Sequence, residues 1–378
     1  MVRKTMAGVA ALAMSLTLAS CSSSSKKTPA ASSAAPTTSS AASSAAPTSA
    51  AATTSAPAAS SAAATTAPAA GGLKIAILPK GLNIPYFDAW YKGAKKACDE
   101  LKAASCDYVG PTQATGDAQL EFIGTLVQKG YDAIVVSAAD KDKVAPALLD
   151  AQKKGITIIT DDADVSDPTA RSLMIQPSSA DLIGIQQVKW ALQLAPNGGE
   201  VAILSAAATA ENQNKWIGFM KTELQKPEYA KLKLVDTVYG DDDAAKSAEK
   251  AAGLMQAHPN LKVIISPTTV GIREAAKYIS GSKYKGKVFV TGLGLPSEMK
   301  AYSKDGTSPV FGLWNPVDLG YIGVYAAAGV HDKTIDPKEG STFKAGTFNL
   351  TVGKDGVVTI GPPFEFTPAN IDEFAAIY

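Results

Sequence analysis

Histidine and cysteine are scarce in this chain. Its 378 residues include two histidines and three cysteines. His258 and His331 each fall at the end of a predicted helix, where the helix dipole favours a basic group, so we interpret both as surface caps. The histidines and cysteines form no cluster with the spacing of metal ligands. We therefore expect no metal site.

Motifs of catalysis and of cofactor binding are also missing. The sequence contains no Gly-x-Ser-x-Gly elbow and no P-loop. Residues 292–297 imitate a dinucleotide-binding loop but lack its third glycine. Asp162 and Asp164 could form the carboxylate pair of a surface glycosidase, but we expect their side chains to point apart. We therefore expect no cofactor and no enzymatic activity, with a glycosidase as the alternative.

Charge of one sign does not dominate the composition. The chain has 36 basic and 35 acidic residues, and four of the basic ones precede Leu73. The rest of the chain then carries 32 basic residues against 35 acidic ones, without a basic stripe. This balance of charge does not indicate the positively charged surface that binds nucleic acid.

The first 72 residues have a composition that cannot form a packed core. Arg3 and Lys4 precede an apolar run too short to span a bilayer, which leads into Leu18-Ala19-Ser20-Cys21. This pattern predicts a secretory signal over 1–21 and resembles the lipobox of bacterial lipoproteins, which implies that Cys21 is lipidated. The alternative is an ordinary signal peptide with an incidental cysteine. Residues 22–72 are nearly all Ser, Ala, Thr or Pro, which predicts a disordered linker.

These features predict where the mature protein works. A secretory signal implies a location outside the cytoplasm, and a lipidated Cys21 implies an anchor on the outer face of the cytoplasmic membrane. Cys98 and Cys106 then remain as an even pair in an oxidising compartment. Cys98 falls late in a predicted helix and Cys106 at the start of the next predicted strand. The pattern leaves two alternatives open, a short disulfide-closed loop and two separate buried thiols.

From Leu73 onward, short apolar strands alternate with helices of about ten or more residues. Strands are predicted at 73–78, 106–109, 133–136, 156–160, 200–204, 234–239, 261–265 and 287–291. Gly130 and Gly155 mark the ends of two of the intervening helices, because a helix often ends in a left-handed residue and glycine adopts that conformation most easily. Such alternation is typical of parallel sheets covered by helices on both faces. We predict an α/β fold with two doubly wound parallel-sheet lobes.

Two local patterns interrupt this alternation. Residues 346–350 and 357–360 flank a Lys354-Asp355-Gly356 turn signal, which predicts a β-hairpin. Asp241-Asp242-Asp243 precedes a predicted helix, which indicates negative charge placed for the helix dipole, with calcium binding as the alternative.

The loops that follow the predicted strands contain the candidate site, because ligands of such sheets lie outside the carboxyl ends of the strands. These loops are polar, amide-rich and aromatic. Their candidate ligand-binding residues are Lys80, Asn83, Tyr86, Phe87, Asp161, Asp162, Asp164, Asn212, Gln213, Thr269, Trp314 and Asn315. Carboxylates and amides suit fixed hydroxyl groups, and aromatic rings suit the C–H face of a sugar. The alternatives are a turn cap for Asp161, a helix cap for Asn212 and packing for Phe87 and Trp314.

At these positions the sequence resembles the type I periplasmic sugar-binding proteins of ABC importers, and among them the rhamnose-binding and autoinducer-2-binding group. The resemblance covers 73–378. It is carried by Ile77-Leu78-Pro79-Lys80, 210–216 (AENQNKW), 291–296 (TGLGLP), 313–321 (LWNPVDLGY) and Gly361-Pro362-Pro363.

This resemblance implies two lobes joined by three crossovers, with the ligand between them. The crossovers are expected near 174–177, 314–316 and 331–334. The first lobe would comprise 73–175 and 316–332, and the second 176–315 and 333–378.

The resemblance also implies binding roles for a set of residues, namely Lys80, Asp162, Asn212, Gln213, Pro267 and Thr269. Asn212 and Thr269 depart from the autoinducer-2-binding pattern, which has aspartate and alanine there. Relatives that bind ribose-like sugars use an aspartate in the loop after Thr291, where this chain has Gly294-Leu295. The departure at Leu295 implies a ligand with fewer hydroxyl groups on that side, with packing of Leu295 as the alternative.

The function that the resemblance implies is that of a monomeric substrate-binding component of an ABC importer. A rhamnose-like deoxy sugar is the favoured ligand, and a membrane permease is the expected partner. The alternatives are a receptor for a furanosyl signal such as autoinducer-2 and the binding of another pentose or polyol.

Overall fold

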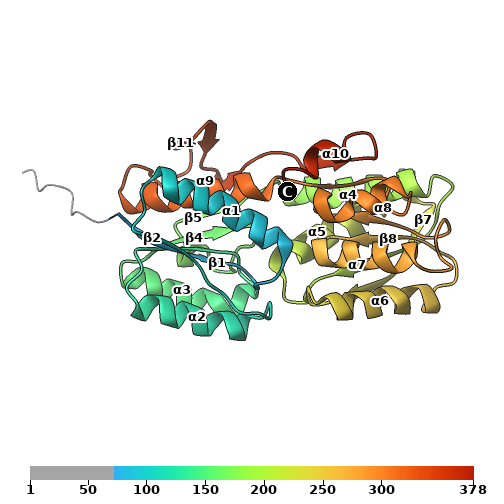
Figure 1. Cartoon of the computed structure of the whole chain (residues 1–378), viewed down its shortest axis with the longest axis horizontal. Helices are drawn as coiled ribbons and strands as arrows, with labels where there is room; N and C mark the ends of the chain where they lie inside the picture. Colours follow the sequence, from blue (N-terminus) through green and yellow to red (C-terminus); the bar gives the residue numbers. More distant parts are fainter. Residues whose placement is uncertain (1–71) are drawn as a thin grey trace, which may run out of the picture. The chain divides into compact units, whose positions relative to one another are not determined.

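The computed structural model describes residues 72–378, which fall within one compact unit. The predicted signal over 1–21, the lipidated Cys21 and the predicted linker up to residue 71 lie outside the described residues. In the part of the chain that is described, no helix is long and apolar enough to cross a membrane. This part forms two lobes, each built on its own sheet (Figure 1).

The first lobe contains a six-stranded parallel sheet with the strand order β13-β5-β4-β3-β1-β2. Its strands are β1 (Lys74–Leu78), β2 (Ser105–Tyr108), β3 (Ala133–Val136), β4 (Thr157–Asp161), β5 (Leu173–Gln176) and β13 (Val357–Thr359). Successive residues of a strand face opposite sides of its sheet. In β1, Ile75 and Ile77 therefore pack into one core, and Ala76 and Leu78 into another.

Helices cover both faces of this first sheet (Figure 1). Helices α1 (Pro85–Glu100) and α9 (Pro316–His331) pack on the face that contains Ile75 and Ile77. Helices α2 (Gly116–Gln128) and α3 (Lys141–Lys153) pack on the opposite face. The centre of the sheet is thus buried on both sides, which explains why β1 and β3 are almost continuously apolar, whereas the edge strand β2 is polar and half-buried.

The second lobe contains a four-stranded parallel sheet with the order β7-β6-β8-β9. Its strands are β6 (Gly199–Ser205), β7 (Leu232–Tyr239), β8 (Leu261–Ser266) and β9 (Phe289–Gly292). Strand β10 (Phe311–Leu313) extends the β9 edge through a parallel bridge and pairs antiparallel with β14 (Phe364–Phe366). The helices of this lobe are α4 (Ala180–Leu194), α5 (Glu211–Glu223), α6 (Ala244–Ala257), α7 (Thr269–Ser280), α8 (Pro296–Lys304) and α10 (Ile371–Phe374). The predicted fold class is confirmed.

The chain passes between the lobes three times. The first passage follows β5 at 177–179, and the second joins β10 to α9 at 314–315, both close to the predicted positions. The prediction of a third crossover near 331–334 is wrong, because β13 adds to the edge of the first sheet beside β5. The third passage joins β13 to β14 at 360–363, so residues 333–359 belong to the first lobe rather than the second.

The predicted hairpin around Lys354-Asp355-Gly356 is also wrong. The hairpin pairs β11 (Thr342–Ala345) with β12 (Phe348–Thr351) and turns at Gly346, whose φ of 55° suits glycine. Residues 354–356 form a short 3₁₀ turn that leads into β13 instead. Val357 to Thr359 prefer β5 because a parallel edge with matched apolar side chains is available there.

Cys98 and Cys106 form a disulfide bond, so the alternative of two separate thiols is wrong. Cys98 lies in the last turns of α1, and Cys106 lies in β2. The bond joins the end of the helix to the outer strand of the first sheet.

Replacing both cysteines by serine is expected to lower the free energy of unfolding by about 2–3 kcal/mol, because a loop of this length has that closure entropy in the unfolded chain. The sequence separation of the two cysteines is 8 residues. Urea unfolding of the wild type and the double variant measures the difference. Ligand affinity is the matched control and should not change, since neither cysteine lines the pocket described below. Equal stability of the two oxidised proteins would contradict this prediction.

Candidate functional site

A small pocket lies at the carboxyl ends of the strands, between residues of the two lobes. The cavity has a volume of about 40 Å³, room for a few water molecules. Its lining residues are Lys80, Ile84, Tyr86, Phe87, Asp162, Asn212, Gln213, Trp216, Asp242, Pro267, Thr268, Thr269, Leu293, Leu313 and Trp314.

The loops and helix starts of the fold bring these side chains together. Lys80 follows β1 and Asp162 follows β4, where Asp162 adopts a left-handed backbone with a φ of 66°. Asn212 and Gln213 lie in the first turn of α5, and Thr269 begins α7. Parallel strands end on the same edge of a sheet, so residues distant in sequence converge there.

Asp162 is the centre of a buried polar network in this pocket. Its carboxylate accepts hydrogen bonds from the Tyr86 hydroxyl at 2.9 Å and from the Ser137 hydroxyl at 2.9 Å. The Lys80 ammonium lies 3.5 Å from Asp162 Oδ2 and donates to Asn212 Oδ1 at 3.1 Å. The Asn212 amide in turn donates to the Asp162 backbone oxygen at 3.3 Å. These bonds directly link the first lobe to the second.

Gln213 is held differently from Asn212. Its side-chain oxygen accepts from the Ser205 hydroxyl at 2.7 Å and from the Ala206 backbone N–H at 2.8 Å. The Gln213 side-chain oxygen therefore bonds to groups at the end of β6. The NH₂ group of the Gln213 amide remains available to donate to a ligand.

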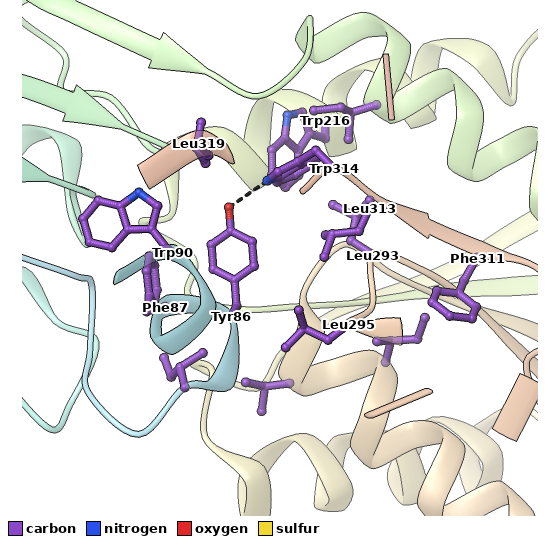
Figure 2. Packing of buried hydrophobic residues seen from close by; sticks show 14 of the residues in the cluster. Tyr86, Phe87, Trp90, Trp216, Leu293, Leu295, Phe311, Leu313, Trp314 and Leu319 are labelled. Carbon is purple, nitrogen blue, oxygen red and sulfur yellow. Dashed lines mark hydrogen bonds between the residues drawn. The ribbon is translucent and has the colours of Figure 1, made fainter. Parts of the chain in front are cut away.

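Aromatic and apolar side chains form the rest of the pocket wall, and several of them are labelled in Figure 2. The Trp314 indole donates to the Tyr86 hydroxyl at 2.8 Å, and the Trp216 and Trp314 rings meet edge to face with centroids 5.8 Å apart. Leu293 and Leu313 complete the wall. Burial raises the pKa of Tyr86 well above its ordinary value, and the charge of Asp162 raises it further. The Tyr86 hydroxyl therefore stays protonated and donates to Asp162.

Most of the predicted ligand residues line this pocket, whereas five do not. Asn83 lies in the outer cleft beside it, and Asn315 accepts from the Val317 backbone N–H as the cap of α9. Asp164 forms a two-pronged ion pair with Arg171, with both N–O distances at 2.8 Å. Leu295 is buried at the start of α8, so that Leu293 takes the place that we predicted for it.

Asp161 is the fifth residue outside the pocket. Its side chain is fully buried against Gly323 of α9, where a Cβ would overlap Oδ2, and neither carboxylate oxygen has a hydrogen-bond partner. Burial raises its pKa well above the ordinary value, which the neighbouring Trp90 indole offsets only in part. Asp161 ends β4 and faces the helices, whereas Asp162 faces the ligand side. The Asp161 side chain therefore does not reach the pocket, as the predicted ligand-binding role would require.

Sequence reasoning missed several lining residues. Ile84, Trp216, Leu293 and Leu313 carry no polar signal that distinguishes them from core residues. Asp242 was interpreted as charge for the α6 dipole, but Asp243 is the residue that caps that helix, by accepting from the Lys246 backbone N–H at 2.7 Å. One aspartate is enough to cap a helix. The presence of three in succession is the signal that could have identified Asp242 as a residue with another role.

The chain matches the family model described as the periplasmic binding protein domain over residues 75–334. A sugar ABC transporter structure from Actinomyces odontolyticus is 43% identical, covering 79% of this chain and 96% of that chain at a TM-score of 0.64. An ABC transporter solute-binding protein from Clostridium phytofermentas with bound L-rhamnose is 34% identical, covering 81% of this chain and 99% of that chain at a TM-score of 0.77.

A third structure, LsrB from Clostridium saccharobutylicum in complex with AI-2, is 24% identical. The match covers 79% of this chain and 99% of that chain at a TM-score of 0.74, which supports the fold alone. The two lobes, the three crossovers and the family match agree with one another. The chain therefore belongs to the type I periplasmic sugar-binding proteins.

Proposed function

We propose that this protein is the lipid-anchored substrate-binding component of an ABC importer and that it binds a 6-deoxy sugar of the L-rhamnose type. The observation that carries the proposal is the mixed lining of the pocket. This lining combines buried hydrogen-bonding groups from both lobes with aromatic rings and leucines, several of which are labelled in Figure 2. A deoxy sugar has the same division between hydroxyl groups and a methyl group.

The polar side suits a ligand with several fixed hydroxyl groups. Lys80 and the Gln213 amide supply donors, Asp162 supplies acceptors, and Asn212 supplies both. These side chains are almost fully buried, with exposed fractions of 4–6% for Lys80, Asp162, Asn212 and Gln213. Buried polar groups need partners, so hydroxyl groups that match their positions are favoured over apolar surface.

The apolar side argues for a methyl group. Leu293 and Leu313 line the cavity there and offer no hydrogen-bond partner. A hydroxymethyl group placed against them would lose its bonds to water without replacement, whereas a methyl group gains from burial. Leu293 lies on the same loop as Leu295, and its place in the pocket lining favours a ligand with fewer hydroxyl groups on that side.

The links between the lobes suggest how binding closes the site. In this structure Lys80 and Asn212 bridge the lobes directly. A sugar between them would replace these bonds with bonds to its own hydroxyl groups. Such a ligand binds the closed form better than the open one and shifts the hinge population toward closure. We propose that the closed form is what the membrane permease recognises, with Cys21 lipidation keeping the monomeric protein near it.

Titration calorimetry of the purified protein tests this proposal. The panel contains L-rhamnose, L-fucose, ribose, arabinose, a linear polyol and autoinducer-2. We expect one-site binding with L-rhamnose at the top of the affinity order. Tighter binding of autoinducer-2 would favour the signal receptor instead. The absence of heat from every member would contradict sugar capture itself.

A further inference from the structure

Three successive aspartates connect β7 to α6, and they have three different environments. Asp241 forms an ion pair with the Lys246 side chain, and Asp243 caps α6. Both therefore have structural roles on the outside of the loop. Asp242, between them, is half-buried and lines the ligand pocket.

The backbone of this loop is unusual. Asp241 and Asp242 both have positive φ angles, of 55° and 51°. Left-handed conformations cost free energy in residues with a Cβ, although aspartate tolerates them better than most. Two such residues in succession turn the Asp242 side chain toward α7, where its Oδ1 accepts a hydrogen bond from the Thr268 hydroxyl.

Asp242 has more acceptor capacity left for a ligand than Asp162 has. The two Asp162 oxygens are engaged by Tyr86, Ser137, Asn212 and Lys80. Within residues 72–378, Thr268 is the single hydrogen-bond donor to the Asp242 side chain, so Oδ2 remains open. A ligand hydroxyl in the pocket could donate to this oxygen without displacing a protein group.

Asp242 also sets the net charge of the pocket. The charged lining residues are Lys80, Asp162 and Asp242, one cation against two carboxylates. The pKa of Asp242 is raised from its ordinary value, chiefly by burial and also by the charge of Asp162, and the Thr268 hydroxyl and the charge of Lys80 offset only part of this rise. Without Asp242 the charges of the lining residues would cancel. With it, an anionic ligand meets uncompensated negative charge in a site shielded from water, where repulsion is strong.

We propose that Asp242 is a specificity-determining residue, which accepts a ligand hydroxyl and makes the site select neutral sugars over sugar acids and sugar phosphates. The inference rests on the proposed function, since it concerns the same pocket. On this proposal the Asp242 carboxylate alone excludes anionic ligands. A variant without this carboxylate should therefore lose the selection against anions but still bind a sugar.

The test compares wild type with Asp242→Asn, using L-rhamnose as the neutral probe and L-rhamnonate, its C1 acid, as the anionic probe. Wild type should bind L-rhamnose and give no measurable heat with L-rhamnonate. Asp242→Asn should bind L-rhamnose about tenfold or more weakly, because a charge-assisted hydrogen bond is weakened. The preference for L-rhamnose over L-rhamnonate should fall by at least about tenfold.

Asp241→Asn is the matched control, because it removes the same charge from the neighbouring left-handed residue outside the pocket. It should retain both the affinity and the preference of wild type. Asp242→Gly is a second variant whose backbone suits the positive φ, and it should lose the preference as Asp242→Asn does. Thermal unfolding confirms that each variant is folded.

The two proposals fail in different ways. If wild type binds none of the panel sugars, the proposed function fails and the inference fails with it. If wild type binds L-rhamnose but both Asp242 variants keep its affinity and its preference, the inference alone is overturned. Binding of L-rhamnonate by wild type as tightly as L-rhamnose would also overturn it.

Discussion

Asp162→Asn is expected to lower the affinity for L-rhamnose by at least about a hundredfold, because removing one partner of a buried charge pair costs several kcal/mol. The variant side chain keeps the size and the tolerance of left-handed backbone that the position requires. It replaces an acceptor oxygen by an NH₂ group among the donors of Tyr86, Ser137 and Lys80. Lys80 is then left buried without its counter-charge. Titration calorimetry measures the loss.

Asp164→Asn is the control for this experiment. Asp164 lies two residues away and pairs with Arg171 rather than lining the main pocket. The control variant should lose stability but keep the affinity for L-rhamnose within about threefold, since the affinity depends on the groups that touch the ligand. Binding by Asp162→Asn that is as tight as binding by the control would show that the polar network does not hold the sugar.

Asp161→Asn is expected to stabilise the protein at pH 7 by about 1–3 kcal/mol, because a neutral amide costs less to bury than an unpaired carboxylate. Both Asp161 oxygens are buried without a partner, and burial raises the pKa well above its ordinary value. Urea unfolding at pH 7 measures the difference. Ligand affinity should not change, because Asp161 does not line the pocket.

The stabilisation by Asp161→Asn is expected to depend on pH. The pKa of Asp161 is higher in the folded state than in the unfolded state. Its contribution to stability is therefore fully present below the unfolded pKa and is lost as the pH rises through the folded pKa. The gain from Asp161→Asn should grow over that interval and be smallest in acid. A gain that is equal at all pH values, or a loss at pH 7, would contradict the burial of an uncompensated charge. Asp150→Asn, which removes a carboxylate from an exposed surface pair, is the matched control.

Much of the architecture could be predicted from the sequence because the signals are local. Apolar runs such as Ala133 to Val136 alternate with helices that end at residues such as Gly130. This rhythm is enough to identify parallel sheets covered on both faces. The pairing of strands distant in sequence is not a local signal, so the sequence does not show that β13 pairs with β5. Its three residues are compatible with a hairpin or with the edge of the first sheet, and only the available edge beside β5 decides.

Within the site, the predictions failed where neighbouring residues have the same chemistry. Asp161 ends β4 and Asp162 follows it, and both are acidic, yet one packs against α9 and the other lines the pocket. For these two neighbours, a shift of one residue reverses the face of the extended chain, and composition does not report that shift. Leu293 and Leu295 lie two residues apart, and only Leu293 lines the pocket, because Leu295 lies at the start of α8. The left-handed backbone at Asp242 is likewise invisible in a run of three aspartates.

The central claim is that one side of the pocket binds sugar hydroxyl groups and the other accepts a methyl group. The most direct measurement is a calorimetric comparison of L-rhamnose with L-mannose, which differ only by a hydroxyl group at C6. The account predicts that L-rhamnose binds about tenfold or more tightly, because the extra hydroxyl would be buried without a partner against Leu293 and Leu313. Equal or tighter binding of L-mannose would contradict it.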